Sequence, residues 1–388
     1  MKLHTSATGI LAILFYFLTL SGASGEAANE AARDREITPK DVIVVANRQV
    51  DASVEIARHY MQKREIPSEN LLLLDVKSDE DIDRECFTVK ISGPVLDFVK
   101  KIEGQGRRVR CILTVYGVPL SIWDPGPIQN EISILKHQIE GINSGTFQGD
   151  LLVLGQKVEQ LEAQVKEMSS RAGAVDSELA VCGIEHKLEG WVDSPFVSEL
   201  EWPRGYYAVS RLDASNPEDV RRMIDGAIEA EEKGLDGIAY FDARGLTGDD
   251  AYSRMDEQIR SAARLLRLEG FATVVDNREE LFGEGECPGA AVYWGWYSLA
   301  KYVDSFEFVP GAIAVHVASG ECNSLREGPY WCRNLIARGA AVTMGPTQEP
   351  YLEAFPAPDE FMERLFAGES VAQAYCATQK VLSWRMVL

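Results

Sequence analysis

Short apolar runs alternate with longer stretches of helical spacing along most of the chain, and this alternation constrains the fold more than any other feature. In the first half the apolar runs cover residues 41–47, 70–76 and 109–119, with helical spacing after the first and a helix opening near Pro94. The runs are almost continuously apolar, which is expected of strands that helices cover on both faces. The pattern predicts βαβ units and a mainly parallel sheet.

The second half repeats this alternation. A helix is predicted after Asn216, with that side chain as its cap, Pro217 in its first turn and Gly234 at its end. Further helices are expected over roughly 252–269 and near 328–338 and 358–383. The predicted strands are 237–242, 271–276, 290–298, 312–320 and 340–345. We therefore expect an α/β protein with two parallel sheets, or two halves of one extended sheet.

A different pattern separates the two halves. Apolar residues recur every three or four positions at Ile128, Ile132, Leu135, Ile139 and Ile142, and again at Leu151, Leu154, Val158, Leu161, Val165 and Met168. This spacing predicts an inserted helical hairpin over residues 128–172, between an N-terminal unit at 37–127 and a C-terminal unit at 173–388. The two stripes could pack on each other or on the domain, or they could provide a contact for a protein partner or a second copy.

The N-terminal residues 1–25 have the composition of a secretory signal. Lys2 stands near the start, an apolar run extends from Ile10 to Leu20, and small residues follow up to Gly25. The run is too short to cross a bilayer and has the length of a signal core. We predict cleavage near Gly25, a secreted or periplasmic location, and no membrane span in the mature chain.

The charge balance excludes one class of partner. The chain has 60 acidic and 39 basic residues, so its formal net charge is −21. Contacts to phosphate need a basic surface, so we predict no nucleic-acid partner and disfavour an anionic membrane surface. The seven cysteines form neither a C-x-x-C pair nor a Cys/His cluster, so no metal or other cofactor is predicted. Cys322 and Cys332, close in sequence, are the pair we suggest as a disulfide.

Candidate site residues follow the predicted strands of the second half. Ligands bind outside the carboxyl ends of the strands in an open parallel sheet. Those positions hold a guanidinium, carboxylates, aromatic rings and two potential nucleophiles: Asp242, Arg244, Asp249, Asp250, Trp296, Tyr297, Ser298, Ser319, Glu321 and Cys322. The three aspartates could bind a hard cation, although Asp249 and Asp250 equally suit a turn that caps a helix.

Several stretches resemble known families. The layout of VDSELAV (175–181), YFDARG (240–245), YWGWYS (293–298) and AVHVAS (314–319) resembles the gingipain-type, caspase-like cysteine peptidases. That resemblance implies two caspase-like α/β subdomains, with a catalytic Gly-His-Gly after one strand and an Ala-Cys after the next. More closely, YGVPL, VDSEL, YWGWYS and WRMVL resemble an uncharacterised exported bacterial family found mainly in genomes that also encode exosortase. The relatives run on through a Gly-Asp-Pro segment, which implies a further strand beyond Leu388.

The chain departs from the peptidases at both catalytic positions. Trp296 stands where they have histidine, and Ser319 stands where they have cysteine. An indole has no lone pair that accepts a proton, and a serine without an adjacent base is a poor nucleophile. His316 lies three residues before Ser319, so strand alternation predicts that it faces the opposite side of the sheet.

Two functional hypotheses follow. In the first, a non-catalytic protein binds or assembles a peptide or surface polymer through Trp296, Arg244, Asp242, Tyr297 and Glu321. In the second, an active hydrolase of the peptidase or esterase class uses Ser319, or a displaced Cys322 thiolate, with a base that the sequence does not identify. Asp176 and Glu178 of the VDSEL stretch are expected to have a structural role, joining the hairpin to the sheet.

Overall fold

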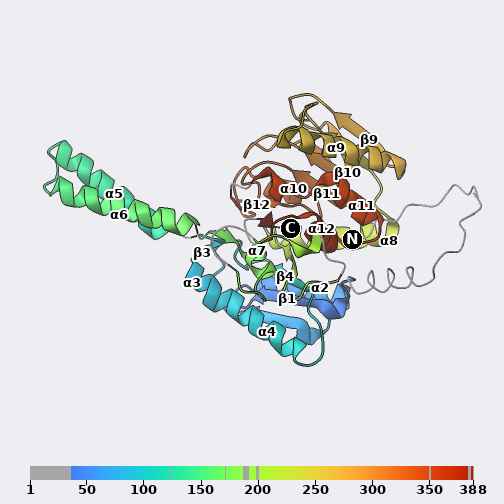
Figure 1. Ribbon diagram of the computed structural model, residues 1–388, viewed down its shortest axis with the longest axis horizontal. Helices are drawn as coiled ribbons and strands as arrows, with labels where there is room; N and C mark the ends of the chain where they lie inside the picture. The colour runs from blue at the N-terminus through green and yellow to red at the C-terminus, as the bar shows by residue number, and fades with distance from the viewer. Residues whose placement is uncertain are drawn as a thin grey trace, which may run out of the picture.

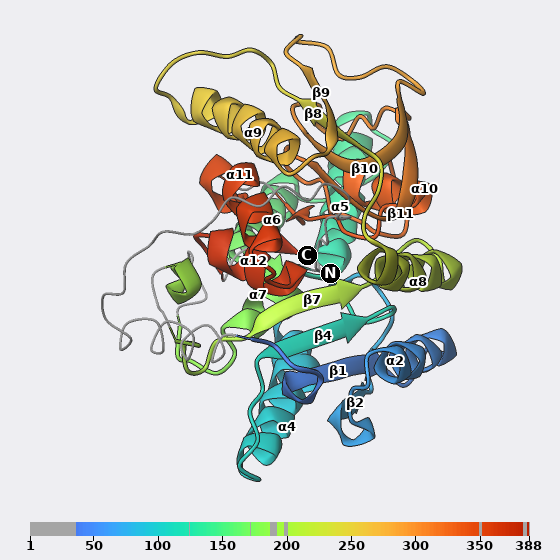
Figure 2. The same ribbon diagram turned by 90° about the vertical axis from the view of Figure 1, so that its right-hand side faces the viewer.

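The computed structural model describes residues 36–382, except 124, 171, 187–191, 198–200 and 349–350, together with residues 386–387. The predicted signal at 1–25 lies outside the described residues. Two four-stranded parallel sheets organise the chain, with an inserted helical hairpin. The predicted α/β class with mainly parallel sheets is therefore confirmed. Figure 2 shows the two sheets one above the other, with α8 (Pro217–Lys233) and α12 (Val371–Thr378) between them.

The first sheet has the strand order β2-β1-β4-β7, and every neighbouring pair is parallel. Its elements are β1 (Val42–Asn47), α2 (Asp51–Lys63), β2 (Leu71–Leu74), α4 (Gly93–Glu103), β4 (Cys111–Val115), α7 (Val175–Ala180) and β7 (Ala208–Leu212). Apolar side chains of α2 and α8 pack on one face, and those of α4 and α7 pack on the other. Helices on both faces explain why these strands are apolar throughout.

The second sheet has the order β11-β10-β8-β9 and is also parallel. Its elements are β8 (Ile238–Asp242), α9 (Ala251–Leu268), β9 (Ala272–Asp276), β10 (Cys287–Gly295), β11 (Phe306–His316), α10 (Trp331–Arg338) and α11 (Pro358–Phe366). The apolar faces of α9 and α11 cover one side, whereas Trp331 and Leu335 of α10 cover the other. Cys332 and Ile336 of α10 belong instead to the apolar cluster on the first sheet. Helix α10 therefore contacts the cores of both units.

The inserted hairpin consists of α5 (Gly126–Asn143) and α6 (Leu151–Ser170) and projects away from the body (Figure 1). Its two apolar stripes pack on each other, with Ile132, Val158 and Leu161 buried between the helices. Lys136 forms an ion pair with Glu162 at 2.8 Å on its exposed side. Of the alternatives that the stripes left open, mutual packing is the one the structure adopts.

Several predicted elements differ in detail. β7 falls within the range 173–388 predicted for the second unit, yet it completes the first sheet beside β4. The run 340–345 forms only an isolated bridge, between Val342 and Ile313, before the short β12. The predicted helix over 358–383 is two helices, because Gly368 interrupts it with a φ of 91°. The cap of α8 is as predicted, since the Asn216 side chain accepts from the Asp219 N–H at 2.9 Å.

Short elements complete the chain. They are the helical turns at Pro39–Asp41, Ser68–Asn70, Arg84–Cys86 (α3), Phe87–Ser92, Pro195–Val197 and Leu352–Ala354, and the strands β3 (Asp81–Ile82), β5 (Ser121–Ile122), β6 (Gly173–Ala174), β12 (Gly345–Pro346) and β13 (Met386–Val387). A search of the described helices finds none with the length and apolar character that crossing a membrane requires.

Candidate functional site

The strands β8, β10 and β11 end level with one another at one edge of the second sheet. Gly295 pairs with Asp242 on one side and with His316 on the other. The Val317 N–H continues the ladder by donating to the Gly295 carbonyl at 2.8 Å. Trp296 and Ser319 therefore follow neighbouring parallel strands, as the sequence predicts. We call this edge the rim.

Trp296 is fixed inside the molecule rather than presented at the rim. Its side chain is 1% exposed, and Nε1 donates to Asp256 Oδ1 at 2.8 Å. Its ring stacks on Tyr252 of α9, with centroids 5.8 Å apart. Strand alternation directs Trp294 and Trp296 toward α9 and α11 and Tyr293 toward α10. In this conformation a ligand cannot stack on the indole, which corrects the prediction that Trp296 binds one.

Asp256 is a residue of this site that the sequence did not reveal. It is fully buried on α9, and its carboxylate accepts from the backbone N–H groups of Arg244 at 2.6 Å and Leu246 at 2.7 Å. Arg260 also forms an ion pair with it. The single acid therefore holds the turn after β8 and the indole of Trp296. An isolated aspartate on the apolar face of a predicted helix was the only available signal.

Arg244 and Tyr297 are the predicted ligand-binding residues that remain accessible. The Arg244 side chain is 26% exposed and pairs with Glu279 at 3.2 Å. Tyr297 is 45% exposed in the loop after β10. Ser319, in the loop after β11, is partly buried. The structure thus places these three on the outer part of the rim and buries Asp242, Trp296, Glu321 and Cys322.

His316 is enclosed on the opposite side of the sheet from Trp296. Its Nε2 accepts from the Ser298 N–H at 3.0 Å, so the ring proton is on Nδ1, which donates to Tyr293 Oη at 2.9 Å. Trp331 stacks on the imidazole with centroids 3.6 Å apart. Burial holds the pKa of His316 well below its usual range. Both nitrogens are used, so this neutral imidazole has no lone pair left to activate Ser319.

Two buried carboxyl groups flank this histidine cluster. Asp242 and Glu321 are each 1% exposed. Burial raises the pKa of Asp242 to about 7 and that of Glu321 to about 8. Asp242 Oδ2 accepts from the Phe282 N–H at 3.3 Å, and Glu321 Oε2 accepts from the Trp331 N–H at 3.1 Å. A mostly protonated Glu321 is not a general base at neutral pH.

Gly295 allows Asp242 and Tyr293 to approach each other. A Cβ at this position would lie 2.5 Å from the Asp242 Cβ and 2.5 Å from Tyr293 Oη. Among the described residues, Asp242 Oδ1 has no hydrogen-bond partner. The space beside Gly295 is therefore occupied from both sides by polar groups whose pKa values burial raises.

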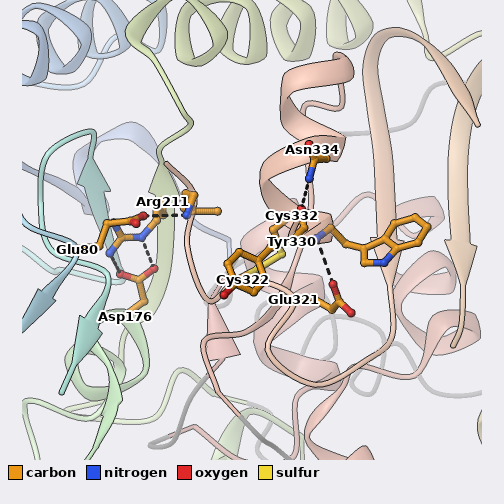
Figure 3. The surroundings of a disulfide bond; sticks show 10 residues. Glu80, Asp176, Arg211, Glu321, Cys322, Tyr330, Cys332 and Asn334 are labelled. Atoms are coloured by element: carbon orange, nitrogen blue, oxygen red, sulfur yellow. Dashed lines mark hydrogen bonds and ion pairs between the residues drawn. A yellow bond between two sulfur atoms is a disulfide. The ribbon is translucent and has the colours of Figure 1, made fainter. Parts of the chain in front are cut away.

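Cys322 and Cys332 form the disulfide suggested by the sequence, with Cα atoms 5.2 Å apart (Figure 3). Both residues are 1% exposed. A bonded sulfur has no thiolate to offer, so the structure corrects the prediction that Cys322 is a nucleophile. The bond ties the loop after β11 to α10.

The loop after β11 is also anchored to the first unit. Glu80 accepts from Ser324 Oγ at 2.5 Å and from the Leu325 N–H at 2.8 Å. Arg326 pairs with Asp213 at the end of β7 and lies over the Tyr116 ring. The loop after β11 is therefore a bridge between the two sheets.

The VDSEL stretch is helical rather than extended, and it is structural. Asp176 accepts from Arg211 of β7 at 2.8 and 2.9 Å, with both side chains buried (Figure 3). Arg211 also donates to Asp213 at 2.9 Å. Glu178 pairs with His186 at 3.0 Å and with Arg84 at 3.3 Å. These ion pairs hold α7 against the first sheet, as the structural interpretation expected.

The three aspartates that could have bound a cation do not form a cation site among the described residues. Asp250 caps α9 by accepting from the N–H groups of Tyr252 at 2.9 Å and Ser253 at 3.0 Å. Asp242 is buried beneath the rim. Within the described ranges, no group of three or more His, Cys, Asp or Glu side chains could hold a metal ion.

A cavity of about 540 Å³ lies between the first sheet and the second unit. One wall is formed by β1, β4, β7, α2 and α8, and the other by α10, residues 341–343 and the first turn of α12. Most of its lining is apolar, and Cys322 of the disulfide contributes to it. Sequence reasoning missed this cavity because its residues come from distant segments.

Two polar atoms in the cavity lining are without partners. Within the part of the chain that the structure describes, Arg64 Nε and Thr343 Oγ1 are buried and make no hydrogen bond. The rest of the Arg64 guanidinium pairs with Glu231, with Nη2 2.9 Å from Oε1. The charged groups Arg211 and Asp213, which also line the cavity, pair with each other. The cavity therefore combines an apolar wall with one free N–H and one free hydroxyl.

Comparisons with known proteins give no family assignment. No family model matches the chain, and no curated protein matches it. One solved structure, described as "Structure of Protease", matches with a TM-score of 0.44 and 11% identity, covering 83% of this chain. The match spans 62% of that protein, which is less than two thirds of its length. A likeness of this size carries no weight for activity.

Proposed function

We propose that this chain is an exported, non-catalytic binding protein on a peptidase-like scaffold, and that it binds an uncharged, apolar peptide segment between its two sheets. The observation that carries the proposal is the cavity of about 540 Å³ with its apolar lining. This volume lies in the ordinary range for ligand sites, which are mostly apolar with a few polar groups that fix orientation.

The free polar atoms favour a peptide over a sugar polymer. A main-chain carbonyl can accept from Arg64 Nε, and either a carbonyl or an N–H can pair with Thr343 Oγ1. A polysaccharide would bring many hydroxyl groups into an apolar cavity with few partners, which is unfavourable. A charged side chain fits poorly as well, because Glu231 and Asp213 already neutralise the arginines that line the cavity.

The rim supports a non-catalytic role. The indole of Trp296 is bonded to Asp256, both nitrogens of His316 are used, and Cys322 is in a disulfide. None of these groups, as the structure places them, accepts a proton from Ser319. The export part of the proposal rests on the composition of residues 1–25.

Titration calorimetry of the mature chain tests the proposal. Short uncharged peptides rich in Leu, Val and Phe should bind, whereas length-matched peptides rich in Asp or Lys should not. Ala227 lines the cavity, so Ala227→Phe should weaken binding at least tenfold by filling it. Ala251→Phe, at the first position of α9, is the matched control and should leave binding unchanged.

A second variant keeps the shape of the cavity. Thr343→Val removes only the free hydroxyl, so the Kd should rise by about fivefold through loss of one hydrogen bond. If no apolar peptide binds, or if Ala227→Phe and Ala251→Phe reduce binding equally, the cavity is not the site. Steady turnover of peptides or esters that Ser319→Ala abolishes would instead establish the hydrolase hypothesis.

A further inference from the structure

We propose that the free end of the α5–α6 hairpin inserts into the surface of an electrically neutral lipid bilayer. The end, here called the apex, consists of Phe147, Leu151, Leu152 and Val153. These side chains are 48%, 43%, 71% and 58% exposed. Large apolar residues gathered at one exposed place mark interaction sites more often than isolated ones do.

The apex is distinct from the seam that joins the two helices. The seam residues Ile132, Val158 and Leu161 are buried between α5 and α6. Beyond the seam, the hairpin carries charged pairs such as Lys136 with Glu162. Phe147 packs on Gly141 and His137 of α5, whereas the large exposed areas of Leu152 and Val153 lie outside the seam.

Local contacts and hydrogen bonds hold the loop of the apex in one conformation. Phe147 lies against Gly141, where a Cβ would overlap its ring. The N–H groups of Thr146 and Phe147 donate to the Gly141 carbonyl at 2.8 and 3.0 Å. Asp150 caps α6 by accepting from the Leu152 N–H at 2.9 Å. Because the loop is held in this way, little conformational entropy is lost when the apex binds.

The charge around the apex selects neutral lipid. Asp150 is the only charged residue between 144 and 156. Anionic lipids attract clusters of Lys and Arg, and this segment has neither. At a rise of about 1.5 Å per residue, the length of α5 places the apex some 27 Å from the hairpin base. The acidic body is then several times the Debye length of about 8 Å away, so it does not repel the surface.

The size of the apex favours a lipid surface over a second copy. Four partly exposed apolar side chains present on the order of 400 Å², whereas a stable protein interface buries about 800 Å² on each partner. Insertion at a membrane interface has no such threshold, because binding increases with the apolar area buried and needs no complementary shape. The hairpin also reaches beyond the body, which leaves the apex sterically free (Figure 1).

Flotation of the full mature chain with phosphatidylcholine vesicles tests this proposal. We expect wild type to float with the vesicles and to do so equally well at low salt and at about 0.5 M salt. Leu152→Ser with Val153→Ser should lower the partition coefficient at least tenfold, since burying one Leu side chain contributes roughly ten- to hundredfold. Ile134→Ser is the matched control, because Ile134 is 60% exposed on the same hairpin but outside the apex.

The proposal is overturned if wild type does not float, or if Ile134→Ser reduces flotation as much as the double variant. Sedimentation velocity tests whether a second copy of the chain, rather than lipid, binds the apex. A dimer that the double variant dissociates, without any vesicle binding by wild type, would identify a second copy as the partner and refute lipid binding. Circular dichroism and urea unfolding measure the folding of every variant, so failure of this proposal is distinguishable from failure of peptide binding in the cavity.

Discussion

Reducing the disulfide between Cys322 and Cys332 should destabilise the protein by about 3 kcal/mol. The two residues are 10 apart in sequence, so the bond closes a loop of about 11 residues in the unfolded chain. The chain-entropy relation for a loop of that size gives about 2.8 kcal/mol at 25 °C. Both cysteines are buried in the apolar cluster of the first sheet, so the reduced thiols keep their packing. The difference between the oxidised and reduced protein therefore reports the cross-link itself.

Urea unfolding monitored by tryptophan fluorescence, with and without reductant, measures this difference. The other described cysteines are free, so reductant should change nothing else there. The variant Cys322→Ala/Cys332→Ala is the control, and reductant should leave its unfolding free energy unchanged. A change below about 0.5 kcal/mol in wild type, or an equal response in the variant, would refute the reasoning. Thiol labelling after unfolding should count five free cysteines without reductant and seven with it.

Three further predictions concern the rim. Trp296→Phe should lower the free energy of unfolding in urea by about 1–3 kcal/mol, because Asp256 loses a buried donor. Peptide binding should not change, and a loss of binding would place the indole in the binding site. Gly295→Ala should cost about 1–3 kcal/mol or more in the same assay, since the added methyl overlaps Asp242 and Tyr293, and a stability equal to wild type would contradict the close approach. Burial raises the pKa of Asp242 from 3.8 to about 7 in the folded protein, so its contribution to stability is complete below pH 4 and is lost as the pH rises toward 7, by up to about 4 kcal/mol. Asp242→Asn should remove this loss from the dependence of the unfolding free energy on pH. An unchanged pH dependence in the variant would show that the carboxyl is not buried as described.

The sequence predicted most of the strands and helices because their apolar runs are long and their caps are clear. β7 escaped prediction because Arg211 stands within the short run of Ala208–Leu212. Its guanidinium is buried beside Asp176, a partner 35 residues earlier in the chain. A charged residue is predicted to be solvent-exposed unless its partner is known, and the spacing along the chain does not reveal that partner.

The candidate site could be predicted only in outline. Parallel strands place Trp296 and Ser319 at one edge, and alternation gives the face on which the indole lies. What the indole contacts depends on Asp256, which comes from a helix that packs from outside the sheet. The cavity is less predictable still, because its walls combine two sheets and segments from both ends of the chain.

Two adjacent residues of helix α10 connect the wall of the cavity to the rim. Trp331 stacks on His316 beneath the rim, while Cys332 is bonded to Cys322 in the cavity wall. The two side chains belong to different apolar clusters, Trp331 to the one on the second sheet and Cys332 to the one on the first. Because Trp331 and Cys332 are adjacent, we expect a molecule that displaces the disulfide from the cavity wall to change the fluorescence of the Trp331 indole.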